Sequence, residues 1–359
     1  MYVITNRKLK KGNGLDVFGK TPNPSGPLEL RLVEVSKIDN VWQTSLVENL
    51  LSADEVKTLK KKFNLDIDVT QNWYGSLRVA CELFERARKE KKSILFFVHG
   101  YNNDVEDVLT TAEQLENTHD VIVVPFTWPA NGGGAVTGTI AYKSDKADAR
   151  ASEGALNRAV GKIHFFHNLL VSGRKEALQV KAEKKHKNNH HAAQALFSKL
   201  MSMECTSTLN LLCHSMGNYV LKKTLLNSGS SMSQLVFDNV CLVAADANNL
   251  NHANWVGNLD VRKRVYIVIN ENDFALKASR IKPGDEQKAR LGHFLMRLNS
   301  DNAYYVNVTD ANLVDNMHTY FVGDAMNNVR LKDIFTGMFK GETVENQLDY
   351  HADNNTYVL

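Results

Sequence analysis

The sequence of 359 residues predicts an α/β fold with a mainly parallel central sheet and helices on both of its faces. Six apolar runs have the length of strands, and they are typical of strands buried on both faces because they do not alternate cleanly with polar residues. Helical stretches separate most of these runs, which indicates right-handed crossovers between parallel strands. The apolar runs span residues 93–98, 121–126, 208–213, 240–245, 265–269 and 304–308, and the helical stretches span 105–115, 144–170, 192–203 and 216–227.

An N-terminal extension, residues 1–91, is expected to pack on a larger domain, residues 92–359. The extension is punctuated by glycine and proline up to about residue 27, and further along apolar residues recur every three or four positions, as in a helix. Its predicted strands span residues 2–5 and 28–35, and its predicted helices span residues 53–63 and 70–91.

A basic insertion is expected near residues 172–191 of the larger domain. Its central part, Arg174 to Lys187, carries six basic and two acidic residues. Two interpretations stay open: a solvated helix or exposed insertion, and a surface that contacts an anionic partner such as phospholipid head groups.

Composition excludes several classes of protein. Hydrophobic residues make up 43% of the chain and the formal net charge is +3, which excludes a mainly disordered chain and gives no indication of a nucleic-acid partner. The four cysteines are scattered and form no C-x-x-C pair, so neither a disulfide framework nor a zinc site is expected. No signal peptide is recognisable, and no apolar stretch approaches the roughly 20 residues that cross a bilayer. We therefore expect a cytoplasmic location.

The sharpest chemical motif is the segment that surrounds Ser215. A buried strand runs into a tight turn and then a helix, with Cys213 and Gly217 two residues away on either side of the serine. This arrangement is that of a nucleophile elbow, which needs small flanking residues and projects the hydroxyl above the sheet. Cys213 stands where glycine is usual. The N–H of Met216, at the start of the helix, is a predicted oxyanion donor.

A second motif follows the first buried strand of the larger domain. There, His99-Gly100 allows the chain to turn closely over the end of the sheet, so that the N–H of Tyr101 points toward the same space as the N–H of Met216. His99 precedes the serine in the chain, and we expect it to anchor the loop.

Together, these motifs resemble the α/β-hydrolase fold, and more narrowly a group of mostly bacterial α/β hydrolases of unknown function. The resemblance rests on residues 97–102 (FVHGYN) and 213–218 (CHSMGN), and on Phe126-Thr127-Trp128-Pro129, Tyr142 and Asp145. It covers roughly residues 92–325. It implies a catalytic triad in the chain order serine, acid, histidine.

Three acids are candidates for the second member of the triad. Asp273 follows the fifth apolar run, and a carboxylate in this position lies at the edge where α/β sheets place their sites. Asp246, at the end of the fourth run, and Glu271 stay open as alternatives.

Among the histidines, His318 is the candidate base, because it follows the last apolar run by a loop and is expected to open a helix. His293 precedes that run and is interpreted as a packing or surface residue, and His351 lies in the polar tail.

The sequence thus predicts a serine hydrolase that cleaves a carboxylic ester through an acyl-enzyme on Ser215, with His318 and Asp273 completing the triad and no metal or cofactor. Trp128 and His214 are expected to contact a small-molecule or lipid ester, although Trp128 is equally explained as packing at the sheet edge. Two alternatives remain: a lipase or phospholipase that meets anionic membranes through Arg174–Lys187, and a catalytically silent binding module.

Overall fold

The computed structural model describes residues 1–359 except 27–28, 131–145, 205–207, 227–233 and 282–287. Within the described residues, eleven strands form one sheet in the order β12-β13-β11-β10-β9-β8-β6-β7-β1-β4-β5, and β2 and β3 form a small hairpin sheet. The strands are β1 (Tyr2–Thr5), β2 (Arg7–Leu9), β3 (Phe18–Pro22), β4 (Arg31–Ile38), β5 (Val41–Leu46), β6 (Ile94–Val98), β7 (Ile122–Thr127), β8 (Leu209–His214), β9 (Asn239–Val243), β10 (Arg264–Ile269), β11 (Ala303–Asn307), β12 (Asp349–His351) and β13 (Thr356–Val358).

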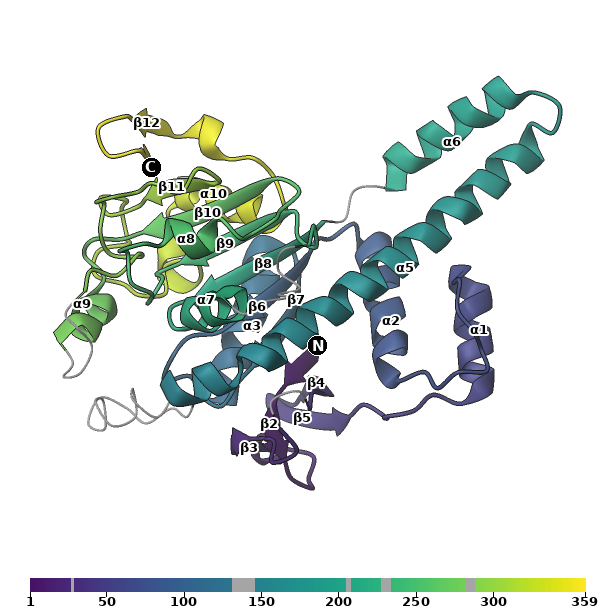
Figure 1. The fold of residues 1–359 in the computed structure, drawn as a ribbon, viewed down its shortest axis with the longest axis horizontal. Helices are drawn as coiled ribbons and strands as arrows, with labels where there is room; N and C mark the ends of the chain where they lie inside the picture. The colour runs from purple at the N-terminus through teal and green to yellow at the C-terminus, as the bar shows by residue number, and fades with distance from the viewer. Residues whose placement is uncertain (27–28, 131–145, 205–207, 227–233, 282–287) are drawn as a thin grey trace.

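Helices cover both faces of this sheet (Figure 1). α5, α7 and α8 pack on one face, and α3 and α10 pack on the other. The helices are α1 (Ala53–Phe63), α2 (Gly75–Glu90), α3 (Val105–His119), α5 (Glu153–Lys185), α6 (His190–Glu204), α7 (Gly217–Leu226), α8 (Ala253–Val256), α9 (Phe274–Ile281) and α10 (Val329–Phe339).

The central strands are parallel, which confirms the predicted fold class. β7, β6, β8, β9, β10 and β11 pair in parallel, and Val98 of β6 lies opposite both Phe126 and Cys213. Every residue of β7, β8 and β9 is buried. The carboxyl ends of β6 and β8, where the two sequence motifs begin, therefore lie side by side.

Local sequence explains where the first crossover helix, α3, begins and ends. Asp104 accepts a hydrogen bond from the N–H of Asp107, and the Asp107 carboxylate accepts one from the N–H of Asp104, which forms a reciprocal cap. The helix ends at Asp120, whose φ of 53° is left-handed.

Residues before position 92 extend the central sheet. β1 pairs in parallel with β7 and antiparallel with β4. The buried Arg7 guanidinium donates hydrogen bonds to the Thr127 hydroxyl at 3.0 Å, to the Ala130 carbonyl at 2.8 Å and to the Gly19 carbonyl at 3.3 Å. The start of the chain is thus fastened to the strand that leads toward Trp128.

The basic insertion is helical. α5 continues through it, and α5 and α6 run side by side away from the strands (Figure 1). The 33 residues of α5 correspond to about 50 Å of helix. Gly173 of α5 allows the end of α1 to pack against this helix. A Cβ at position 173 would lie 2.4 Å from the carbonyl oxygen of Asn64, the residue that follows α1. Among the described residues, no helix combines the length and the apolar content needed to span a membrane.

We predict that Arg7→Met lowers the free energy of unfolding by about 2–4 kcal/mol, because the substitution leaves buried acceptors without a donor. Arg31→Met is the matched control: Arg31 pairs with Glu29 at a partly exposed site, and its loss should cost less than about 1 kcal/mol. Urea denaturation followed by circular dichroism measures both values. Equal losses in the two variants would contradict this account of how the N-terminal strands are attached.

Candidate active site

Ser215 lies in a strained turn between β8 and α7. Its φ of 53° is left-handed, a conformation that costs an L-residue about 1–2 kcal/mol. Backbone hydrogen bonds hold it: the Ser215 N–H donates to the Val243 carbonyl, and the Ser215 carbonyl accepts from the N–H of Asp246, each at 3.1 Å. The neighbouring strand β9 and the residues after it therefore maintain the conformation that the elbow motif requires.

Two glycines bring other backbone segments against the elbow. A Cβ on Gly217 would lie 2.5 Å from the Val98 carbonyl oxygen, and a Cβ on Gly100 would lie 2.7 Å from Cβ of Ser215. Neither position has room for a larger residue. The loop after β6 is consequently in direct contact with the candidate nucleophile.

Asn218 is a supporting residue that the sequence analysis missed. Its buried side-chain amide donates to the carbonyls of Cys213 at 2.9 Å, Ser215 at 3.1 Å and Val243 at 3.2 Å. One side chain thus connects β8, the turn and β9. A polar residue in the first turn of the helix after the elbow is the only signal of this role in the sequence.

Asp273 and His318 lie in contact, although 45 residues separate them in the chain. Nδ1 of His318 lies 2.7 Å from Oδ2 of Asp273, and the aspartate side chain is fully buried. The other carboxylate oxygen accepts from the N–H of Leu276 at 3.0 Å, in the first turn of α9. This pairing orients the ring so that Nε2 is the nitrogen left to exchange a proton with a hydroxyl.

The expectation that His318 opens a helix is wrong. It lies in an irregular loop after β11. The buried Asn270 side chain holds this loop by donating to the carbonyls of Asp315 at 3.0 Å and Met317 at 3.1 Å, and the N–H of Phe274 donates to the Asn316 carbonyl at 3.2 Å. Asn270 is a second supporting residue that the sequence analysis did not single out, although it immediately follows β10.

His214 connects the His318 loop to the elbow. Its ring centroid lies 4.7 Å from that of His318, and its Nε2 lies 3.1 Å from the His318 carbonyl oxygen. Burial and the neighbouring His318 hold the pKa of His214 well below its usual value, so that the ring is neutral and Nε2–H donates to this carbonyl. His318 therefore lies against the residue that precedes Ser215.

His99 and Trp128 form a buried pair at the ends of β6 and β7. Their rings stack at 5.2 Å, the Trp128 N–H donates to Nε2 of His99, and the indole N–H donates to the His99 carbonyl. Nδ1 of His99 in turn donates to the Gly100 carbonyl at 2.9 Å. His99 thus contacts the loop as an anchor would. Trp128 is fully buried, and its contacts with His99 are those of a packing residue, which is one of its two interpretations.

The two expected oxyanion donors are the N–H groups of Met216, which follows the serine, and of Tyr101, which follows Gly100. Met216 lies between Ser215 and the first residue of α7, where backbone N–H groups have no acceptor within the helix. Tyr101 directly follows Gly100, whose backbone packs on Ser215. Such N–H groups stabilise negative charge that develops on a carbonyl oxygen of a substrate.

Of the alternative acids, Asp246 is engaged elsewhere, because its Oδ1 lies 3.0 Å from Nε of the buried Arg290 and accepts a hydrogen bond from the Ser279 hydroxyl at 2.8 Å. Glu271 is exposed and accepts from the N–H of Leu295 at 3.3 Å.

The alternative histidines also lie in other surroundings. His293 is buried with its ring against Phe294, and His351 is exposed in β12.

Tyr142 and Asp145, on which the resemblance also rests, lie outside the described residues. Among the residues that are described, no three His, Cys, Asp or Glu side chains gather as ligands for a metal ion. A small cavity of about 40 Å³ lies beside Met216, with Tyr219 and Lys222 in its wall.

The comparison with known proteins identifies one family. A family model described as "Alpha/beta hydrolase of unknown function (DUF900)" matches residues 79–168 and 172–317, which is more than half of the chain. No curated protein and no solved structure matches the chain.

We predict that acid destabilises the protein partly through His99. Burial lowers the pKa of His99 to about 3 in the folded protein, against about 6.5 in the unfolded chain. Below pH 6.5 the unfolded state binds the additional proton, so the free energy of unfolding falls, by about 2 kcal/mol from this residue at pH 5. Urea denaturation at pH 7 and pH 5 measures the difference, and His99→Gln should reduce it by that amount.

Trp128→Phe is the control for this prediction, because it removes the indole N–H that bonds the His99 carbonyl and keeps the titrating ring. It should lower stability at both pH values and preserve the pH dependence. A pH dependence unchanged in His99→Gln would contradict the assignment.

Proposed function

Because this chain belongs to the family of α/β hydrolases of unknown function, we propose that it is a serine hydrolase that cleaves a carboxylic ester. One observation supports the proposal: Ser215 has a left-handed backbone at the end of a buried strand, and His318, paired with Asp273, lies against His214, the residue that precedes Ser215. A serine that only caps a helix needs neither the strained backbone nor a histidine whose Nδ1 faces a buried carboxylate.

In the proposed reaction, Nε2 of His318 accepts the proton of the Ser215 hydroxyl while the oxygen attacks the ester carbonyl carbon. Asp273 keeps the proton of the imidazole on Nδ1 and stabilises the imidazolium ion that forms. The bond from the carbonyl carbon to the alkoxy oxygen then breaks, and His318 transfers its proton to that oxygen, which leaves as the alcohol and leaves an acyl group on Ser215. Water, activated by the same ring, releases the acid from Ser215 and regenerates the enzyme.

Stabilisation of the oxyanion comes from the N–H groups of Met216 and Tyr101 in this proposal. Loss of one such donor typically lowers the rate by about 10²–10³. The support for Tyr101 is the contact of Gly100 with Ser215. The ring of His99 holds the same loop, because Nδ1 donates a hydrogen bond to the Gly100 carbonyl.

A second candidate function is hydrolysis of lipids at an anionic membrane surface. The observation that favours it is the projecting pair of α5 and α6 (Figure 1). The lysines of the Arg174–Lys187 segment are exposed on this pair. Lysines near a membrane surface attract anionic lipid head groups by about 1 kcal/mol each.

We also propose a cytoplasmic location, and the free thiols of Cys81, Cys213 and Cys241 are compatible with a reducing compartment.

We predict that a fluorophosphonate probe labels Ser215 in the folded protein, because the probe reacts with an activated serine as an ester does. Mass spectrometry of tryptic peptides locates the adduct. Ser215→Ala should abolish the labelling, and Ser36→Ala, at an exposed position in β4, should leave it unchanged. A folded protein that remains unlabelled, or is labelled at another serine, would reject the proposal.

We predict that Asp273→Asn lowers kcat for p-nitrophenyl esters by about 10⁴, because an amide favours the wrong imidazole tautomer. Glu271→Gln, two residues away and exposed, should retain the activity of the unmodified protein. An Asp273→Asn variant that keeps more than a tenth of the activity would remove Asp273 from the triad.

For the membrane candidate, we predict that the double variant Lys184→Gln/Lys185→Gln binds anionic vesicles about 30-fold more weakly, from a loss of about 2 kcal/mol. The matched control is Lys10→Gln/Lys11→Gln, which neutralises two exposed lysines outside the helical pair. Vesicle cosedimentation at low and high salt measures both. Binding that is insensitive to salt, or equal in the two variants, would exclude this role for α5.

A further inference from the structure

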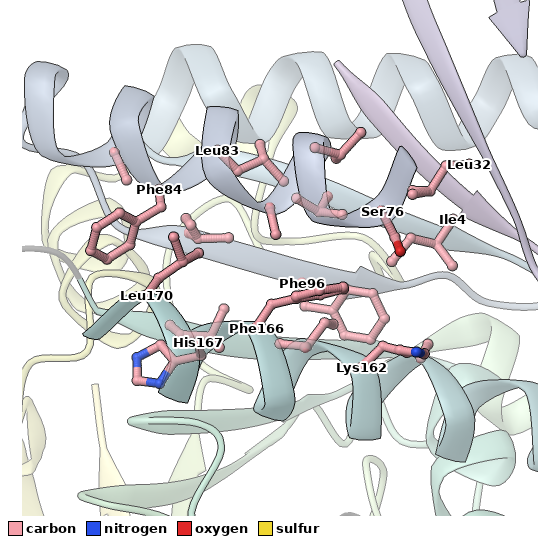
Figure 2. Close-up of a pocket in the computed structure, with 18 of the residues that line it drawn as sticks. Ile4, Leu32, Ser76, Leu83, Phe84, Phe96, Lys162, Phe166, His167 and Leu170 are labelled. Atoms are coloured by element: carbon pink, nitrogen blue, oxygen red, sulfur yellow. The ribbon is translucent and has the colours of Figure 1, made fainter. Parts of the chain in front are cut away.

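A large cavity that the proposed hydrolysis does not use lies between α2, α5 and the sheet. Its volume is about 750 Å³, within the roughly 300–1,000 Å³ of small-molecule sites. Figure 2 shows Leu83 and Phe84 of α2 on one side of it and Phe166 and Leu170 of α5 on the other, with Phe96 of β6 between them.

The cavity is separate from the candidate active site. Among its described lining residues are neither Ser215 nor Asp273 nor His318. Where the cavity reaches β8 it meets Leu209, the first residue of the strand, whereas Ser215 follows the last. Six steps at ~3.3 Å each place that end of the cavity about 20 Å from the serine. A ligand there is bound independently of the acyl-transfer chemistry.

The wall of the cavity is apolar but incompletely packed. Its side chains lie between helices and sheet, where close packing is the rule, and yet many are only partly buried. Apolar surface of this kind, gathered in a hollow, marks a binding site. The partly buried apolar residues are Ile4, Ala80, Leu83, Phe84, Ile94 and Ile163.

The lining of the cavity carries more positive than negative charge. The lining includes eight basic and three acidic residues, and two of the acidic residues pair with Arg31 and Arg262. Arg158 and Lys162 lie one turn apart on α5, are exposed, and form no ion pair within the described part of the chain. The cavity thus combines an apolar interior with an excess of cations at its border.

We propose that this cavity binds one long-chain anionic amphiphile. Its hydrocarbon chain lies between α2 and α5, where the lining of α5 from Ala159 to Leu170 extends over roughly 16 Å. Its carboxylate or phosphate head group lies at Arg158 and Lys162. A neutral hydrocarbon would leave both cations without an anionic partner, and a compact polar anion would leave the aromatic wall in contact with water.

The test measures binding of cis-parinarate, a fluorescent fatty acid, to the full-length Ser215→Ala protein, so that no outcome depends on the proposed hydrolase activity. We expect saturable binding of one molecule per chain. Palmitate or a palmitoyl lysophosphatidate, each below its micelle concentration, should displace the probe, and the stronger competitor identifies the head group. Hexadecyltrimethylammonium, which has the same chain length and the opposite charge, should compete at least tenfold less well; equal competition would overturn the proposal.

Two pairs of variants locate the site. Ala80→Trp fills the cavity and should weaken probe binding at least tenfold, whereas Lys89→Trp, on the exposed side of the same helix, should not. Arg158→Gln/Lys162→Gln should also weaken it at least tenfold, with Lys181→Gln as the control on α5. Circular dichroism establishes that each variant is folded.

Besides equal competition by hexadecyltrimethylammonium, either of two further results would overturn the proposal. One is that the folded variants Ala80→Trp and Arg158→Gln/Lys162→Gln both bind the probe as tightly as the protein without these substitutions. The other is absence of probe binding. If light scattering then shows a dimer that Ala80→Trp dissociates, the cavity is an interface between two copies of the chain.

Discussion

The candidate site depends on one strained residue. Ser215 adopts a left-handed backbone only because its surroundings hold it there: Val243 and Asp246 bond its backbone, and the Asn218 amide bonds its carbonyl. The strain costs about 1–2 kcal/mol, and the several buried hydrogen bonds around it offset that cost. Gly100 is also required, because only a residue without a side chain lets the loop after β6 approach the serine.

The parallel sheet brings the other parts of the site to the same edge. β6, β8 and β10 end at the same edge of the sheet, with β9 between β8 and β10, and the loops that follow them carry Gly100, Ser215 and Asp273. His318 arrives from the loop after β11, which Asn270 fastens at the end of β10. Three rigid strands and one fastened loop therefore determine the geometry, and burial keeps His99 and His214 neutral so that both serve as hydrogen-bonding supports.

Periodicity and small residues made much of this predictable. The buried strands were recognisable because parallel strands covered on both faces are continuously apolar. The elbow was recognisable because it requires small residues two positions before and after the serine. Asn218 and Asn270 were not recognisable, since their partners lie up to 47 residues away and asparagine is common in turns. The error at His318 has a similar origin. Asn270 after β10 and His214 at the end of β8, both distant in the sequence, hold its loop, so that the local sequence does not need to form a helix. The cavity beneath α5 also results from tertiary packing, because no periodicity specifies how far two helices stand from a sheet.

The most direct test of the central claim is a crystal structure of the protein after reaction with an organophosphonate. The account predicts a covalent bond from phosphorus to Oγ of Ser215, with the phosphonyl oxygen about 3 Å from the backbone nitrogens of both Met216 and Tyr101. It also predicts Nε2 of His318 beside the adduct, with Nδ1 still on Asp273. An adduct on another residue, or a phosphonyl oxygen that points away from both amides, would contradict it.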